Sequence, residues 1–214
     1  MIQLYNTYLS EKNHEDLLQN SLVKFPADFQ NKIKKFRRWQ DAQCLLLGRV
    51  MPFKGIEELK MQNCDKREIK YTTYKKPYFD DNLVEFNISH SGEIVFCALS
   101  EEHQIGIDIE LITNVDFQNF QSQMTEREWN TLNASDNKID AFFKYWTQKE
   151  AVIKVYGHEL SLPLKSFEIQ DDSTQINDQT FYLKEVTINK NYKCYISSKI
   201  NMDEIIIKNY NPNN

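Results

Sequence analysis

The sequence predicts an α+β fold of two related halves that join near residue 104. Strand-like segments open the chain at residues 1–9 and recur in its last third, and a long helical segment lies in each half. A weak internal echo is the third observation, because "DAQCLLLG" at 41–48 and "EAVIKVYG" at 150–157 share an acid, Ala and a Gly six residues later. A match this short also arises by chance at helix ends, so repeat and coincidence stay open as equal alternatives.

The composition is that of an ordinary globular chain. Its 214 residues, 41% hydrophobic and 27% charged, suffice for one large domain or two small ones. The net charge of −5 argues against a nucleic-acid binder. No apolar run approaches the roughly 20 residues of a membrane span, so no membrane partner is expected. The four cysteines, Cys44, Cys64, Cys97 and Cys194, include no CxxC pair, and no apolar targeting segment follows Met1. These two observations predict that the protein works in a reducing cytoplasm.

The first half is predicted to carry one helix and a pair of strands after the opening strand. Residues 28–47 read as helical, and Gly48 is the expected helix end. Strands are expected at 84–88 and 94–99, with "SHSGE" at 89–93 as the connecting turn.

The second half is predicted to begin with a strand at 105–110 and to continue with helices. Thr125 followed by Glu128 fits a capping box, and Gly157 marks the end of the strongest helix. The expected helical segments are 117–123, 125–132 and 139–156, and the expected strands are 167–170, 180–187, 192–197 and 204–207.

The segment "IGIDIE" at 105–110 places two acids on one face of a strand. Asp108 and Glu110 lie about 6.8 Å apart along that face, opposite the isoleucines. Two carboxylates held so close repel unless a cation lies between them, and Mg2+ completed by substrate phosphate fits that geometry. A solvent-exposed acidic face is the alternative interpretation. Gly106 favours the ligand site slightly, since a missing side chain leaves space.

The helical segment "YWTQKEAVIK" brings a third acid and an amine onto one stripe. Trp146, Glu150 and Lys154 follow one another at intervals of four residues. Taken alone, Glu150 and Lys154 are most often an exposed ion pair worth about 0.2–0.5 kcal/mol. Brought to the face of Asp108, they would complete the parts of a phosphoryl-transfer site.

Other features suit a small phosphate-bearing ligand. Residues 24–38 contain six basic side chains against Asp28 alone, which predicts either a solvated helix face or a phosphate site. His90 within "NISHSG" could donate a hydrogen bond to phosphate oxygens; the alternative is a structural role, which is usual for a lone histidine in a turn. A P-loop, a GxGxxG motif and an HExxH motif are absent from the sequence.

Three motifs occur in this order along the chain: "FNISHSGEIVFCALS", "IGIDIE" and "FFKYWTQKEAVIKVYG", with "KKP" upstream of them. Because the motifs and their order are those of the Sfp-type 4′-phosphopantetheinyl transferases, the chain resembles that family over residues 1–167. The resemblance implies a pseudo-dimer of two similar α/β-sandwich halves, 1–104 and 105–214, with coenzyme A in the cleft between them. It implies Mg2+-dependent transfer of the 4′-phosphopantetheine arm to a serine of an acyl or peptidyl carrier protein, releasing 3′,5′-ADP. A monomer is expected, because the cleft already lies within one chain.

The resemblance also assigns the catalytic residues. Asp108, Glu110 and Glu150 match the family's magnesium ligands, and Lys154 matches a lysine that contacts phosphate and protonates the leaving group. Glu128 matches a further glutamate and is a candidate base for the carrier serine. The choice between Glu128 and Glu150 as the base stays open at this stage.

For coenzyme A itself, Lys32, Lys76, Ser89 and His90 match contact positions. The chain departs from the family at Lys75, which replaces a usual glycine, and at Cys44 and Leu45, which replace an arginine and a polar residue. We hypothesise that a nearby cation compensates, the candidates being Lys34, Lys35, Arg37 and Arg38. Two rival functions are a non-catalytic coenzyme A or carrier-binding module and a metal-dependent phosphohydrolase.

Overall fold

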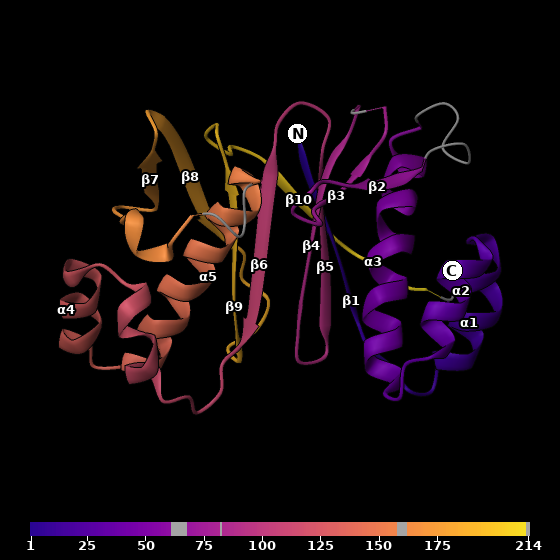
Figure 1. The fold of residues 1–214 in the computed structure, drawn as a ribbon, viewed down its shortest axis with the longest axis horizontal. Helices are drawn as coiled ribbons and strands as arrows, with labels where there is room; N and C mark the ends of the chain where they lie inside the picture. Colours follow the sequence, from indigo (N-terminus) through magenta and orange to yellow (C-terminus); the bar gives the residue numbers. More distant parts are fainter. Residues whose placement is uncertain (61–67, 82, 158–161, 213–214) are drawn as a thin grey trace.

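Two four-stranded sheets pack face to face in the computed structural model, and helices cover the outer side of each sheet (Figure 1). The structure describes residues 1–60, 68–81, 83–157 and 162–212, so the sequence features at Cys64 and His158 lie outside the described residues. In the described part of the chain, no helix is long and apolar enough to cross a membrane. The predicted α+β class with two sheet-containing halves is confirmed.

The first half opens with β1, whose sequence alternates between two buried faces. The elements of this half are β1 (Ile2–Tyr8), α1 (His14–Ser21), the 3-10 turn η1 (Leu22–Lys24), α2 (Ala27–Lys34), α3 (Trp39–Glu58), β2 (Ile69–Tyr71), β3 (Pro77–Phe79), β4 (Glu85–Ser91) and β5 (Ile94–Ser100). β1 pairs antiparallel with β5, and β5 pairs antiparallel with β4.

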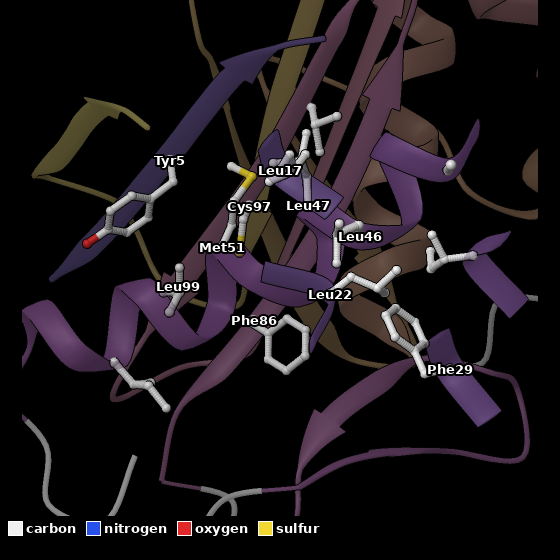
Figure 2. Packing of buried hydrophobic residues seen from close by; sticks show 14 of the residues in the cluster. Tyr5, Leu17, Leu22, Phe29, Leu46, Leu47, Met51, Phe86, Cys97 and Leu99 are labelled. Atoms are coloured by element: carbon white, nitrogen blue, oxygen red, sulfur yellow. The ribbon is translucent and has the colours of Figure 1, made fainter. Parts of the chain in front are cut away.

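Strand β5 is buried on both faces, which explains its uninterrupted apolar sequence "IVFCALS". Phe96 and Ala98 face the second sheet, whereas Cys97 and Leu99 face α3. Figure 2 shows Cys97 and Leu99 in the cluster that α3 closes with Met51. The first sheet therefore lies between two hydrophobic clusters, one on each of its faces.

The second half places α5 on the outer face of its sheet. Its elements are β6 (Ile105–Leu111), the 3-10 segment η3 (Phe117–Gln123), α4 (Glu126–Ala134), α5 (Lys138–Tyr156), the 3-10 turn η4 (Leu164–Ser166), β7 (Ser173–Ile176), β8 (Gln179–Glu185), β9 (Tyr192–Ser198) and β10 (Ile205–Asn209). The strand order is β6-β9-β8-β7, and Val152 of α5 packs with Phe181 and Tyr195 of this sheet.

The last strand, β10, returns to the first sheet, where it pairs parallel with β1. The first sheet therefore has the order β10-β1-β5-β4 and contains residues from both ends of the chain. The division into domains at residue 104 stays a prediction, and β10 lies across it.

The two halves meet along β4 and β6, which belong to different sheets yet run side by side (Figure 1). Side chains take the place of a backbone ladder. Ile107, Ile109 and Leu111 donate their backbone N–H groups to the side-chain oxygens of Asn87, Ser89 and Ser91, respectively. Both sets advance by two residues in the same direction, so each of these polar side chains holds one residue of β6 in register.

Several element predictions are confirmed. The opening strand, β5, β6 and α5 lie where they are expected, and α4 begins with the predicted capping box of Thr125 and Glu128. Gly157 ends α5 in the left-handed conformation at φ 80°.

The predicted helix over 28–47, ending at Gly48, is wrong in both respects. Two helices occupy the region, and α3 continues to Glu58 with Pro52 inside it. Gly48 and Pro52 stand four residues apart, so the proline removes the hydrogen bond to the Gly48 carbonyl and its ring crowds that carbonyl. Burial of Met51, Pro52 and Gly55 against the first sheet outweighs that loss.

Two further predictions are wrong. "SHSGE" is not a turn as a whole, because β4 extends to Ser91 and leaves Gly92, at φ 55°, and Glu93 as the turn. The seam with β6 uses the serine side chains of that strand. The strand expected at 167–170 forms instead at β7, because Phe167 and Ile169 pack beneath α5.

Candidate active site

The acidic face of β6 lies beneath α5, buried rather than exposed. Asp108 is only 4% exposed, so the interpretation as a solvent-exposed acidic face is wrong for this residue. Gly106 does not make space for a ligand. A Cβ added at Gly106 would lie 2.2 Å from the Ala151 carbonyl oxygen and 2.6 Å from the Val155 nitrogen, so the helix backbone fills that space. The glycine permits the close approach that brings Lys154 to Asp108.

Lys154 joins α5 to both halves. Its ammonium lies 2.7 Å from Asp108 Oδ1, 3.0 Å from Ser89 Oγ and 3.1 Å from the Ile107 carbonyl oxygen. Ser89 also donates to Asp108 Oδ1 at 3.0 Å. Lys76, 7% exposed, donates across the interface to the backbone carbonyl of Lys154 at 2.9 Å, where a cation suits the carboxyl end of the helix. The structure thus brings four predicted site residues together: Lys76, Ser89, Asp108 and Lys154.

One oxygen of this cluster lacks a partner. Asp108 Oδ2 is buried and has no hydrogen-bond partner, although burying a bare carboxylate oxygen is costly. Glu110 lies on the same face, and its Oε2 accepts from Ser91 Oγ at 2.9 Å. Burial first, and the neighbouring Asp108 charge second, raise the pKa of Glu110 above its ordinary value. The two acids repel each other, as the sequence predicts.

This pair fits a magnesium ion in part. The orphaned Asp108 oxygen and the raised pKa of Glu110 both show an excess of negative character that a cation would relieve. Mg2+ is commonly held by one or two carboxylates with water and phosphate. Among the described residues, however, no three His, Cys, Asp or Glu side chains gather into a metal-binding group, so Glu150 does not join the pair in this arrangement.

Glu150 lies one turn before Lys154 on α5. Both residues line a pocket of about 350 Å³, together with Gln123 and the segment Leu162, Pro163 and Leu164. Glu150 is half-buried, so its carboxylate is accessible from the pocket. Trp146, expected on the same stripe, faces another pocket of about 330 Å³, where it stands beside Glu110 and Phe120.

Glu128 occupies a closed structural site. Its Oε2 lies 2.9 Å from Lys149 Nζ, and both side chains are 1% exposed. The carboxylate also accepts from the backbone N–H groups of Thr125 and Ile169, and Lys149 donates to the carbonyls of Leu164 and Phe167. The structure therefore places Glu128 in a buried ion pair with Lys149 and not in the cluster of Asp108 and Lys154.

The largest of these pockets, about 500 Å³, lies over the first half and collects the remaining predicted residues. Lys32 and His90 line it, as do the unusual Cys44 and Leu45. Partial burial, and then the charge of Lys154, lower the pKa of His90, so the ring is predominantly neutral at pH 7. Cys44 is half-buried, and its burial raises the pKa of the thiol to about 11, so this cysteine is protonated at pH 7.

Sequence reasoning missed Arg49 in this pocket. The available signal was its position four residues after Leu45, which puts both side chains on one face of α3. None of the four cations hypothesised to compensate at this pocket lines it; they are Lys34, Lys35, Arg37 and Arg38.

Comparison with known proteins agrees with this arrangement. Residues 104–204 match the 4′-phosphopantetheinyl transferase superfamily, and residues 13–102 match the family described as 4′-phosphopantetheinyl transferase, N-terminal. The chain is 30% identical over 204 residues to the 4′-phosphopantetheinyl transferase Sfp of Bacillus subtilis (strain 168), which covers 90% of each protein. It is 34% identical over 150 residues to the 4′-phosphopantetheinyl transferase gsp of Aneurinibacillus migulanus, covering 68% of this chain and 62% of that relative.

A vertebrate relative shows how far the likeness extends. The L-aminoadipate-semialdehyde dehydrogenase-phosphopantetheinyl transferase of Xenopus laevis is 27% identical over 157 residues, which are 66% of this chain and 52% of that protein. The matches span both halves of the fold and the strand and helix that carry Asp108 and Lys154. On these grounds the chain belongs to the Sfp-type 4′-phosphopantetheinyl transferases and is an enzyme of that class.

Proposed function

We propose that this enzyme transfers the 4′-phosphopantetheine arm of coenzyme A to a serine hydroxyl of an acyl or peptidyl carrier protein, in a reaction that depends on Mg2+. The observation that carries the proposal is the cluster of Lys154, Asp108 and Ser89 at the interface of the two halves, with one buried carboxylate oxygen lacking a partner. A cation and an unsatisfied acid at one spot suit a metal-bound pyrophosphate.

The donor extends from this cluster into the 500 Å³ pocket. Ser89 and His90 are consecutive residues of β4, so the pocket begins beside the cluster. In this proposal Ser89 and Lys154 contact the pyrophosphate, whereas Lys32 and His90 contact the nucleotide. Lys76 does not contact the donor in this proposal. Its amine donates to the backbone carbonyl of Lys154 near the carboxyl end of α5, and so it fixes the position of Lys154.

Magnesium fits the residues on β6. Asp108 and Glu110 would hold the ion, and when bound it would neutralise pyrophosphate oxygens that carry charge in the transition state. Glu150 is assigned to the metal by the family resemblance alone.

The transfer is an in-line displacement at phosphorus. The serine oxygen forms a bond to the phosphorus atom that bears the pantetheine arm, and the bond from that phosphorus to the bridging oxygen breaks. The bridging oxygen leaves with 3′,5′-ADP, and Lys154 stabilises its negative charge. Glu150 takes the serine proton, because its carboxylate lines an accessible pocket whereas that of Glu128 is enclosed by Lys149.

The partner and setting follow from this chemistry. The acceptor is a carrier protein that meets the enzyme near the pocket of Glu150 and Lys154. We propose that the enzyme works as a monomer, because both halves of the site come from one chain. We also propose that it works in the cytoplasm, because its cysteines include no CxxC pair.

The test is intact-mass analysis of apo carrier proteins incubated with the enzyme, coenzyme A and Mg2+, beside an EDTA control. A phosphopantetheine-sized gain on the carrier that requires metal is the expected result. Consumption of coenzyme A without a carrier would indicate a phosphohydrolase instead. Coenzyme A binding with no gain on any carrier would indicate a non-catalytic binding module.

A further inference from the structure

Arg49 is a cation in the 500 Å³ pocket to which no role has yet been assigned. It lies in the middle of α3, and its guanidinium carbon is 5.0 Å from the ring centroid of Phe29 and 5.0 Å from that of Tyr71. Its Nη2 also donates to the Tyr71 hydroxyl. Two rings and a hydroxyl therefore hold the planar group in one orientation.

No carboxylate neutralises this guanidinium among the residues that the structure describes. Its contacts there are the two aromatic rings and the tyrosine hydroxyl, all of which leave the charge intact. Arg49 is half-buried and lines the pocket, so its charge is accessible to a ligand there. The arrangement is typical of a site that awaits an anion from outside the chain.

The lining of the pocket has the charge that an anion requires. Lys32 and Arg49 are cationic, and the one acid among the described lining residues, Asp41, is exposed. Lys32 is exposed, whereas Arg49 is held between the rings of Phe29 and Tyr71, so Arg49 supplies the oriented charge.

We propose that Arg49 binds the 3′-phosphate of coenzyme A and so determines the preference for the 3′-phosphorylated donor; this rests on the function proposed above. The pyrophosphate end of the donor is already accounted for by the cluster of Ser89, Asp108 and Lys154, which is at the His90 side of the pocket. Arg49 lines the same pocket as Lys32, which the proposed function assigns to the nucleotide, and it is not among the residues that bond the cluster. A planar guanidinium matches a phosphate monoester through two parallel hydrogen bonds.

The proposal also accounts for Cys44 at a pocket position where the family resemblance expects an arginine. Cys44 and Arg49 line one pocket from the same helix, so a guanidinium supplied from position 49 restores the charge. This replaces the hypothesis of compensation by the cations of residues 34–38, whose side chains do not line the pocket.

Steady-state transfer with two donors tests the assignment. R49Q should raise the KM for coenzyme A by about tenfold or more, the loss typical of one charge-assisted hydrogen bond, with little change in kcat. The KM for 3′-dephospho-coenzyme A should change by less than about twofold, because that donor lacks the phosphate. An equal rise for both donors, or no rise for coenzyme A, would overturn the proposal.

Binding without a carrier separates this inference from the proposed reaction. Calorimetry should show wild-type protein binding 3′,5′-ADP more tightly than 5′-ADP, and R49Q should lose about tenfold of that difference. Equal binding of the two nucleotides by wild type would reject the Arg49 assignment even if transfer is observed. The preference with no transfer to any carrier would instead retain the phosphate site and reject the transferase.

Two control variants separate the loss of the Arg49 guanidinium from a general effect on folding or charge. K54Q makes the same charge change on α3, at a lysine paired with Glu57 outside the pocket, and should leave both KM values unchanged. R49K keeps the charge but loses the planar fork, and it should fall between wild type and R49Q for coenzyme A alone. If R49Q does not fold, a wild-type ratio of the two KM values in R49K would count against the proposal.

Discussion

At the scale of single residues, Lys154 determines both the charge balance and the chemistry of the site. Three oxygen atoms surround its ammonium, which has three N–H donors, so the group is fully bonded without substrate. Contact with a phosphate therefore requires that one of the three bonds be exchanged. Of the three partners, only the Ser89 hydroxyl can rotate to suit a phosphate oxygen without moving a charge.

We expect K154M to lose transfer by about 10²-fold or more and to lose about 3 kcal/mol of unfolding free energy in EDTA. Removing the lysine leaves Asp108 as a buried carboxylate without a cation, which is the costly half of a broken ion pair. Intact-mass rates and urea unfolding measure the two effects. The double variant D108N/K154M should regain stability without regaining activity. Equal instability of the double and single variants would contradict the ion-pair account.

A second residue-scale prediction separates the two candidate bases. E128Q should lose about 3 kcal/mol of stability, because it leaves Lys149 charged in a site where burial already lowers the lysine pKa despite the raising effect of Glu128. Its kcat, measured below the unfolding transition, should stay near wild type. E150Q should lose about 10²-fold in kcat and little stability. The reverse pattern would return the base to Glu128.

The sequence predicted part of this site and missed part of it for identifiable reasons. The strand period and the helix period place Asp108 and Lys154 on faces that can meet, and the structure joins them at 2.7 Å. Nothing in the spacing reveals that Glu128 is enclosed, because its partners come from Lys149 and from the segment at Ile169. Arg49 was missed because its neighbours Phe29 and Tyr71 come from other elements.

At the scale of elements, the contact between β6 and α5 positions the site. G106A should cost about 1–3 kcal/mol, since the new methyl group would overlap the backbone of α5 at Ala151 and Val155. Pushing α5 outward also moves Lys154 from Asp108, so transfer should fall more steeply than stability alone would explain. Thermal unfolding and intact-mass rates measure both effects.

The matched control is G48A in α3. A Cβ there meets only Ile88 side-chain atoms at 3.5 Å, an ordinary contact, and alanine favours a helix interior by about 0.5–1 kcal/mol over glycine. Its unfolding midpoint should therefore equal or exceed that of wild type. If G106A and G48A had the same unfolding midpoint, the close approach of α5 to β6 would not be the reason for a glycine at position 106.

Element boundaries were predicted well where local chemistry decides them and poorly where packing does. Gly157 ends α5 and Thr125 begins α4 as predicted, because a left-handed glycine and a capping box act within one turn of the chain. At Gly48 the same local reasoning failed, because α3 continues past it and through Pro52. There the helix is held by its contact with β5, which no local pattern contains.

At the scale of the whole molecule, the polar seam between β4 and β6 joins the two halves. Each of the three side chains on β4 accepts one N–H of β6, and Ser89 and Ser91 also bond the two acids of that strand. The same residues therefore hold the halves together and set the acidic pair. The predicted two-part architecture is visible in the order of elements, but this coupling through serine hydroxyls depends on the register of two strands from different sheets.

The chain also closes on itself through β10, which Lys208 fastens to the first half. Its ammonium lies 2.8 Å from Glu58 Oε2 at the end of α3 and 3.0 Å from Gln3 Oε1 on β1. Partial burial by itself would raise the pKa of Glu58, but hydrogen bonds from Lys208 and Tyr5 outweigh it and lower that pKa below the ordinary 4.5. The contacts of Lys208 with Glu58 and Gln3 thus link three elements that are far apart in sequence.

We expect K208M to lose up to about 1 kcal/mol of unfolding free energy at pH 7, a modest loss because both partners are about one-third exposed. Because the pKa of Glu58 is lower in the folded state than in the unfolded state, its stabilising contribution is complete well above 4.5 and is lost as the pH falls below that value. The gap between wild type and K208M in urea unfolding should therefore narrow below pH 4.5. K190M, which removes an exposed lysine, is the control, and its difference from wild type should not narrow in this way. If the difference between wild type and K208M did not depend on pH, Lys208 would act through packing on Tyr5 rather than through Glu58.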